Sequence, residues 1–231
     1  MTDRPILFSA PMVRALLEGR KTQTRRIVKP QPAGRIDPLV SFNHGRMEIA
    51  FGPDMRDKDG RPKWWRPLAQ AGDRLWVREA YYLTDDGDYP SAVYAADAES
   101  VHLHLASIEQ LRVCHPNIDW SKHARLRPSI HMPRWASRIT LDVIDVRVER
   151  LKDITEVDAI AEGVVKIRDA CHVIRGFDYD LSGLCHTSAT TPFLKLWNHI
   201  NGADTWETNP WVAAYTFNVI NRNIDQLEVA P

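Results

Sequence analysis

The sequence is poor in cysteine. Cys114, Cys171 and Cys185 are its three cysteines, an odd and sparse set. Small secreted domains instead carry paired cysteines that form a disulfide framework. We therefore expect no such framework here, and a reducing, cytoplasmic location.

Long apolar runs are missing as well. No stretch reaches the roughly 18 consecutive apolar residues that indicate a membrane span. The N-terminal segment also lacks the apolar core of a secretion signal. The sequence therefore predicts no membrane partner.

Neither sign of charge is in excess. The 30 Lys and Arg residues balance the 30 Asp and Glu residues, and the isoelectric point is near 7.1. Without a net positive field, affinity for nucleic acid has to come from a local patch. A ligand of nucleotide size fits this balance better than a long duplex.

The chain does have enough apolar sequence for a core, since 44% of its 231 residues are hydrophobic. Alternating segments predict strands at 6–8, 21–29, 46–51, 74–78, 91–97, 138–151 and 209–220. Capping residues and apolar spacing predict helices at 10–18, 156–162 and 191–201. Short strands separated by a few helices, without a repeat or a clear linker, indicate one small β-barrel domain with attached helices.

A basic segment, "GRKTQTRR" at residues 19–26, lies at the junction between the first predicted helix and the next strand. It suits a phosphate-binding strip, or a nucleophile with its activating lysine. A solvated basic edge of a sheet has the same composition. Lys21 and Thr24 are three residues apart, which places them on one face of a helix but on opposite faces of a strand. Their side chains converge only if the chain bends between them.

Four segments resemble the ASCH domain: "PMVRALLEGRKTQTRR", "GDRLWVRE", "RITLDVIDVRVERLKDITEVDAIAEG" and "LWNHIN...NPWVAAYTF". The resemblance implies an α+β fold, a PUA-like (ASCH) β-barrel with attached short helices. It covers most of the chain as a single domain over residues 1–231. Two segments, at about 31–66 and 167–190, are insertions relative to the smallest members of the family.

The resemblance also implies an activity. Small bacterial members of the superfamily are amidohydrolases that remove the acetyl group from N4-acetylcytidine without a metal. Their motif is G-x-K-T-x-T after the first helix, with a glutamate at the end of the helix that follows the long strand. By position, Lys21 is the implied base and Thr24 the implied nucleophile. Glu162 matches the glutamate, because it has the same spacing from the helix-starting Thr155.

This chemistry makes demands that the residues can meet in part. Amide hydrolysis needs a nucleophile, a base, stabilisation of the oxyanion and a proton for the leaving amine. A lysine acts as a base only if its pKa falls well below about 10.4, through burial or cationic neighbours. Arg20, Arg25 and Arg26 supply such neighbours to Lys21. Glu162 can hold the lysine, position water or protonate the amine, and the sequence does not choose among these roles.

The predicted substrate-binding residues are Arg20, Arg26, Trp76, Glu79 and Tyr81. Glu79 follows a predicted strand, where it suits either a hydrogen bond to a cytosine edge or an ion pair with Arg78 or Arg26. The two aromatic residues, and Trp135 with them, suit either stacking on a base or filling the core.

A zinc site is a competing interpretation. The dipeptide Cys-His occurs at 114–115, 171–172 and 185–186. Adjacent Cys and His do not have the usual spacing of zinc ligands, and the resemblance implies chemistry without a metal. We therefore predict no metal and no cofactor.

Three functions remain in competition. The first is an amidohydrolase that cleaves N4-acetylcytidine and related N4-acylcytidines to cytidine and a carboxylic acid, with a small-molecule modified nucleoside as its partner. The second is an RNA-binding PUA-like module that uses the basic segment and Lys29. The third is a ribonuclease built on the same cations and a carboxylate. None of the three requires an obligate protein partner.

Overall fold

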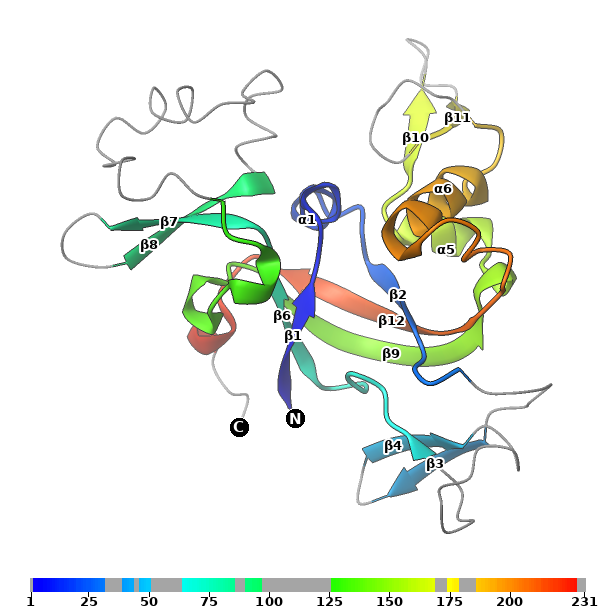
Figure 1. Cartoon of the computed structure of the whole chain (residues 1–231), viewed down its shortest axis with the longest axis horizontal. Helices are drawn as coiled ribbons and strands as arrows, with labels where there is room; N and C mark the ends of the chain where they lie inside the picture. The colour runs from blue at the N-terminus through cyan, green and yellow to red at the C-terminus, as the bar shows by residue number, and fades with distance from the viewer. Residues whose placement is uncertain are drawn as a thin grey trace. The chain divides into compact units, whose positions relative to one another are not determined.

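The computed structural model describes residues 2–31, 39–43, 46–50, 64–85, 90–96, 126–168, 174–178 and 186–227 (Figure 1). The described strands are β1 (Asp3–Leu7), β2 (Gln23–Ile27), β3 (Leu39–Asn43), β4 (Arg46–Ala50), β5 (Trp64–Trp65), β6 (Arg74–Arg78), β7 (Tyr81–Asp85), β8 (Pro90–Tyr94), β9 (Thr140–Arg150), β10 (Val165–Arg168), β11 (Ile174–Asp178) and β12 (Trp211–Ile220). The described α-helices are α1 (Ala10–Leu17), α5 (Glu156–Ala161) and α6 (Thr190–Asn201). The fold is therefore mixed α+β with a core made mostly of sheet, which confirms the predicted class.

One sheet contains five of the described strands, in the order β1-β6-β9-β12-β2. β1 runs parallel to β6, whereas β6 pairs with β9 and β12 with β2 in antiparallel fashion. Closure into a barrel requires every strand to have two neighbours. Among the described strands β1 and β2 remain the two ends of the order, and no closed barrel is present. The PUA-like barrel expected from the sequence is therefore not confirmed.

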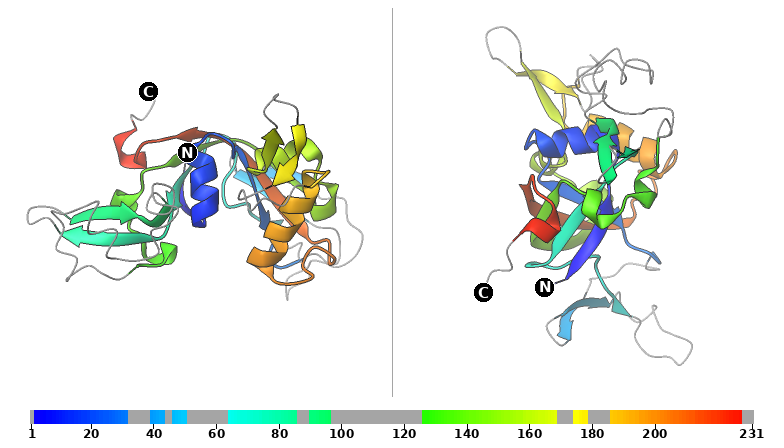
Figure 2. Two further views of the ribbon diagram at one scale, coloured as in Figure 1. Left: turned by 90° about the horizontal axis from the view of Figure 1, so that it is seen from above. Right: turned by 90° about the vertical axis from the view of Figure 1, so that its left-hand side faces the viewer.

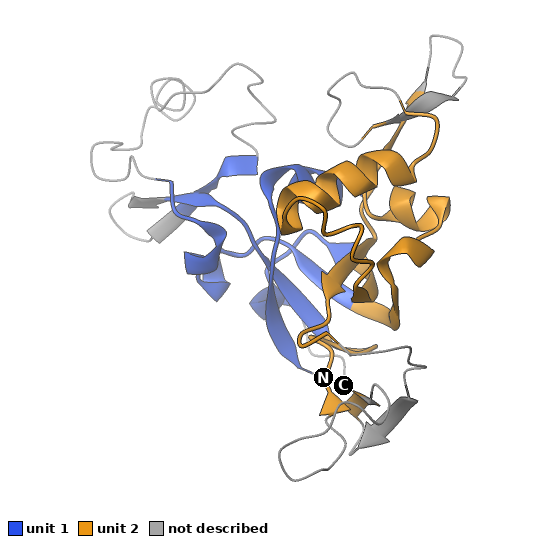
Figure 3. Cartoon of the chain, turned by 45° about the vertical axis from the view of Figure 1, so that its right-hand side comes forward, with its two compact units in different colours: residues 1–19, 74–142, 219–231 blue, residues 20–73, 143–218 orange. Residues whose placement is uncertain are grey.

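The chain divides into two compact units (Figure 3). Unit 1 consists of residues 1–19, 74–142 and 219–231, and unit 2 consists of residues 20–73 and 143–218. Each unit thus combines segments that are far apart in the sequence. The predicted single domain over 1–231 stays a prediction.

Unit 1 contains a small core of its own. Tyr81, Met132 and Ala136 are buried together, and Tyr94 of the β7–β8 hairpin packs against them. Asn223 organises the polypeptide nearby, because its side-chain amide donates hydrogen bonds to the carbonyls of Arg134, Trp135 and Ser137. A buried amide that satisfies three carbonyls fixes a segment that has little regular structure.

Helix α1 also belongs to unit 1, and its sequence explains its limits. Ser9 occupies the N-cap position with Pro11 in the first turn, although the serine side chain makes no capping hydrogen bond. Met12, Val13 and Leu16 form the buried face, as the apolar spacing predicts. Gly19 follows the last turn with φ of 70°, the left-handed conformation that commonly ends a helix.

Unit 2 holds β2, most of β9 and β12, and the helices α5 and α6. Val28, Ile49 and Trp211 form one of its buried clusters, with Trp65 packed against it. Helix α6 lies beside α5 (Figures 1 and 2) and buries Phe193, as its apolar spacing predicts. Helix α5 also contacts β2.

Both segments predicted as insertions contain regular structure where they are described. The first carries β3 and β4, paired in antiparallel fashion, with β5 added to β4. The second carries the antiparallel hairpin of β10 and β11. The weak strand signal at 46–51 is confirmed by β4.

Among the described residues, no helix has both the length and the apolar sequence that crossing a membrane would require.

Replacing Gly19 by Ala is expected to destabilise the protein by about 1 kcal/mol, because an L-residue resists a positive φ. An added Cβ would meet no heavy atom within 4 Å, so the cost is one of backbone conformation rather than of space. Denaturant unfolding measures this change. Ser9→Ala is the control with a smaller expected effect, since the Ser9 side chain caps nothing. An unfolding midpoint unchanged by Gly19→Ala would contradict the prediction.

Candidate functional site

The candidate site of unit 2 begins where the segment before β2 meets the end of α5. The amide of Thr22 donates to the carbonyl of Ala161 at 2.8 Å, and the Thr22 carbonyl accepts from the amide of Phe217 at 2.9 Å. Residues 20–22 are therefore held between α5 and β12. They precede the first residue of β2, Gln23, so the alternation of a regular strand does not apply to Lys21.

Helix α5 is defined at both of its ends. Thr155 and Asp158 form a capping box at its start, in which the threonine hydroxyl accepts from the Asp158 amide. Glu162 is the C-cap, and Gly163 follows with φ of 108°. This ending presents the carboxylate and the carbonyl of Glu162 to the segment before β2.

Lys21 and Glu162 form a buried ion pair. The Lys21 ammonium Nζ lies 2.7 Å from Oε2 of Glu162 and donates to the Glu162 carbonyl at 2.9 Å. The exposed fraction is 0% for Lys21 and 3% for Glu162. Burial lowers the pKa of Lys21, the Glu162 carboxylate opposes this, and the charges of Arg26 and Arg25 lower it further. The structure thus brings together the predicted base and the predicted glutamate.

Arg20 reaches the same helix end. Its guanidinium donates to the carbonyl of Gly163 at 2.6 Å. Carbonyls at the C-terminus of a helix carry partial negative charge, which cations stabilise. Two cations, Arg20 and Lys21, therefore hold the end of α5.

Arg25 joins the site from the middle of β2, with its side chain fully buried. It lies between three carboxylates: Oε1 of Glu149 at 2.6 Å, Oε1 of Glu162 at 3.2 Å and Oδ2 of Asp158 at 3.4 Å. Its guanidinium also donates to the side-chain carbonyl of Gln23. The sequence identifies Arg25 only as a cationic neighbour of Lys21, since nothing in it pairs an arginine of β2 with carboxylates of β9 and α5.

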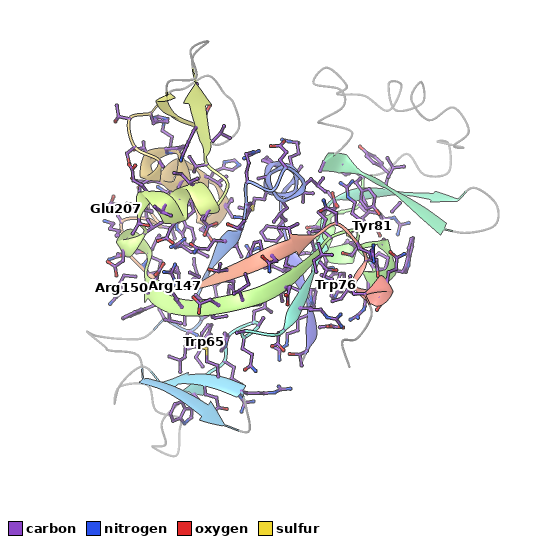
Figure 4. All side chains as sticks on the ribbon, turned by 180° about the vertical axis from the view of Figure 1, so that it is seen from behind. Trp65, Trp76, Tyr81, Arg147, Arg150 and Glu207 are labelled. Carbon is purple, nitrogen blue, oxygen red and sulfur yellow. The ribbon has the colours of Figure 1, made fainter. Side chains whose placement is uncertain are left out.

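Asp158 has a second arginine, Arg147 of β9, which is labelled in Figure 4 and donates to Oδ1 at 3.0 Å. Partial burial raises the pKa of Asp158. Hydrogen bonds from Thr155 and Arg147 and the charge of Arg25 outweigh that effect and lower the pKa to about 2. Asp158 is therefore firmly ionised and holds a negative charge beside Arg25.

Thr24 lies in β2 opposite Tyr215 of β12 and has an exposed fraction of 1%. Arg26 is half-buried. Burial lowers its pKa, against the opposing charge of Glu162. The start of β2 thus carries the predicted nucleophile and two arginines in a largely buried setting.

This burial corrects one interpretation of the segment 19–26. A solvated basic edge requires exposed cations, yet Lys21 and Arg25 are buried and paired with carboxylates. Gln23 and Thr24 are buried as well, so both faces of β2 are covered at this point. Charge composition could not reveal this, because the compensating carboxylates lie more than a hundred residues away in the sequence.

The other predicted substrate-binding residues lie in unit 1, where each has a structural contact. Glu79 forms a two-pronged ion pair with Arg138, at 2.9 and 3.0 Å, an arginine that the sequence did not single out. Tyr81 is buried and its hydroxyl donates to the His131 carbonyl. Their predicted binding role stays a prediction.

Two tryptophans of unit 1, Trp76 and Trp135, differ in exposure. Trp76, labelled with Tyr81 in Figure 4, is 8% exposed, and the guanidinium of Arg78 lies over its ring. Trp135 is 46% exposed. The core position of Trp76 fits the filling of space better than the stacking of a base.

The zinc interpretation falls mostly outside the described residues, which include His186 but none of the three cysteines. His186 lies 3.2 Å from the ammonium of Lys195. No group of three or more His, Cys, Asp or Glu side chains in the described ranges could hold a metal ion.

Lowering the pH tests the charge on Asp158. A pKa depressed from 3.8 to about 2 contributes about 2 kcal/mol of stability. This contribution is fully present above the ordinary pKa and is lost as the pH falls through the lowered one. Unfolding free energies measured from neutral to acidic pH should therefore fall more steeply for the wild type than for Asp158→Asn. Equal pH dependence in the two proteins would contradict the prediction.

A double-mutant cycle tests the buried ion pair. Lys21→Met should lower the unfolding free energy by about 3–5 kcal/mol, because it leaves the buried Glu162 carboxylate with one cation fewer. Lys21→Met/Glu162→Gln should recover part of that loss. The exposed pair of Lys152 and Glu207, at 2.6 Å, serves as the matched control and should show much weaker coupling. Additive effects at Lys21 and Glu162 would show that the pair is not coupled.

Comparison with known proteins leaves the site to be interpreted from its own chemistry. No protein-family model, curated protein or solved structure matches this chain.

Proposed function

We propose that this protein is a metal-independent amidohydrolase of the ASCH type, which cleaves the N4-acyl amide of N4-acetylcytidine and related N4-acylcytidines. Thr24 is the nucleophile, Lys21 the base, and Glu162 the group that holds the lysine. The observation that carries the proposal is the buried contact of 2.7 Å between Lys21 Nζ and Glu162 Oε2. It joins the two most widely separated members of the motif named from the sequence.

The environment of Lys21 supports its role as a base. A base must be neutral when it accepts a proton, and an ordinary lysine is protonated near neutral pH. Burial and the charges of Arg26 and Arg25 lower the pKa of Lys21, which increases the neutral fraction. The Glu162 carboxylate opposes this effect and keeps the amine in one place.

The proposed reaction proceeds in two stages. The Thr24 oxygen attacks the acyl carbon while its proton passes to neutral Lys21. The resulting tetrahedral intermediate collapses: the bond to the exocyclic nitrogen breaks, and protonated Lys21 returns the proton to the leaving amine. Water, deprotonated by Lys21, then attacks the acyl-Thr24 ester. The ester bond breaks, the proton returns to the Thr24 oxygen, and a carboxylic acid leaves.

Arg20 and Arg26 are the predicted substrate-binding residues that share unit 2 with this motif. A half-buried arginine suits the oxyanion of the tetrahedral intermediate, which needs a fixed positive group. We assign this function to Arg26. Arg20 has a structural bond to Gly163, so its contribution is to hold the end of α5 in place.

RNA binding and ribonuclease activity are less well supported. Both need cations that phosphates can reach, and a phosphate-binding surface normally presents its lysines and arginines to solvent. Lys21 and Arg25 are buried against carboxylates instead. The proposal therefore takes a small-molecule modified nucleoside as substrate, with no cofactor, in the cytoplasm and on a PUA-like domain.

The proposal predicts turnover of N4-acetylcytidine in the presence of EDTA, followed as the ultraviolet change when cytidine forms. Thr24→Val removes the hydroxyl from a buried strand position at little change of shape and should abolish turnover. Thr24→Ser keeps a hydroxyl and should retain part of the activity. Thr22→Val is the matched control, because Thr22 is exposed and its backbone makes the recorded contacts.

Two results would count against the proposal. Undiminished turnover by folded Thr24→Val would show that Thr24 is not the nucleophile. Absence of turnover of this substrate and of bulkier N4-acylcytidines by the wild type would remove the activity itself.

A further inference from the structure

The geometry points to Arg25 as a positioning residue that fixes the Glu162 carboxylate in the orientation that serves Lys21. The inference rests on the function proposed above for its kinetic consequences. Its structural basis is the set of contacts around the Arg25 guanidinium.

The two oxygens of Glu162 are divided between two cations. Oε2 lies 2.7 Å from Lys21 Nζ, and Oε1 lies 3.2 Å from a terminal nitrogen of Arg25. A carboxylate held at one oxygen can still rotate about its terminal bond, whereas one held at both cannot. Arg25 therefore determines which oxygen of Glu162 pairs with Lys21.

Arg25 can do this because it is itself fixed. Its Nε and one terminal nitrogen both donate to Oε1 of Glu149, at 3.1 and 2.6 Å. The other terminal nitrogen donates to Gln23 as well as to Glu162. The planar guanidinium presents its donors in fixed directions, and lysine has no equivalent geometry. Arg25 thus transmits the position of β9, through Glu149, to the carboxylate at the end of α5.

Arg25 also changes the charge that Lys21 experiences. The charged groups that act on Lys21 include Glu162, at the end of α5, and Arg26 and Arg25 from β2. When Glu162 also binds Arg25, its carboxylate stabilises the protonated form of Lys21 less than it would if Lys21 were its only partner. Arg25 therefore favours the neutral amine that the reaction needs.

The test compares Arg25→Gln and Arg25→Lys with the wild type by two readouts. The first is the titration of Lys21, followed by NMR of protein labelled with ¹³C-lysine, with the Lys21 signal assigned from Lys21→Arg. The second is the pH dependence of kcat/KM for N4-acetylcytidine. Arg147→Gln is the matched control, because Arg147 contacts Asp158 and no hydrogen bond joins it to Glu162 within the described residues.

In Arg25→Gln the Lys21 midpoint should move to higher pH, since one positive charge is lost and Oε1 of Glu162 loses its bond to Arg25. The acid limb of kcat/KM should move with it, which lowers kcat/KM at neutral pH by about tenfold. Arg25→Lys keeps the charge but loses the planar guanidinium group. The Lys21 midpoint should therefore rise by less than in Arg25→Gln. Arg147→Gln should leave both readouts where the wild type has them.

A Lys21 midpoint that is unchanged or lower in folded Arg25→Gln would overturn the inference. If Arg25→Gln does not fold, Arg25→Lys supplies the same test, because it loses the planar guanidinium that holds Oε1 of Glu162 and keeps a charge beside Glu149. A higher midpoint in that variant supports the inference, and an unchanged one overturns it. Because the NMR titration needs no substrate, an inactive wild type would refute the proposed function without deciding the role of Arg25.

Discussion

The described site of unit 2 depends on the ion pair between Lys21 and Glu162, two groups that could not remain charged and buried without each other. Removing an isolated ammonium or carboxylate from water is costly, and the cost is offset only by close pairing and additional hydrogen bonds. Lys21 meets this requirement with the carboxylate and the carbonyl of the same residue. Glu162 meets it with two cations, one at each oxygen.

From this pair the charges extend outward in alternation. Arg25 is followed by Glu149 on β9 and by Asp158 on α5, and Asp158 is followed by Arg147. Within this series of contacts, alternation of sign gives each buried charge an opposite neighbour. It also joins elements that apolar packing alone would hold with less specificity, because an apolar contact has no direction whereas a guanidinium fork does.

Sequence reasoning anticipated the elements well where local signals are strong. The capping residue Thr155 and the terminating Gly163 located α5, and the alternation of β-branched residues located β9. Closure of the sheet into a barrel is not confirmed, and local signals could not decide it, because the pairing of distant strands leaves no periodic signal in either strand. Sequence reasoning also left a solvated basic edge open as one interpretation of residues 19–26, because the burial of β2 on both faces depends on elements far along the chain.

For the candidate site the sequence named Lys21 and Glu162 through a family resemblance, and the structure brings these two together. It did not find the partners of Arg25 or of Glu79. In both cases an arginine pairs with a carboxylate chosen by the three-dimensional fold, and the many charges in the sequence offer several equally plausible partners. Local sequence patterns therefore predict whether a segment is a helix or a strand, whereas the partners of an ion pair depend on the three-dimensional fold.

The two hydrogen bonds from Lys21 to Glu162 have a further consequence, because one of them goes to the main chain. The nitrogen is tied to the backbone at the end of α5 as well as to a side chain that could change rotamer. Any rotation or sliding of that helix would displace the amine directly. A ligand or partner that moved α5 would therefore change the position of the Lys21 nitrogen without contacting Lys21.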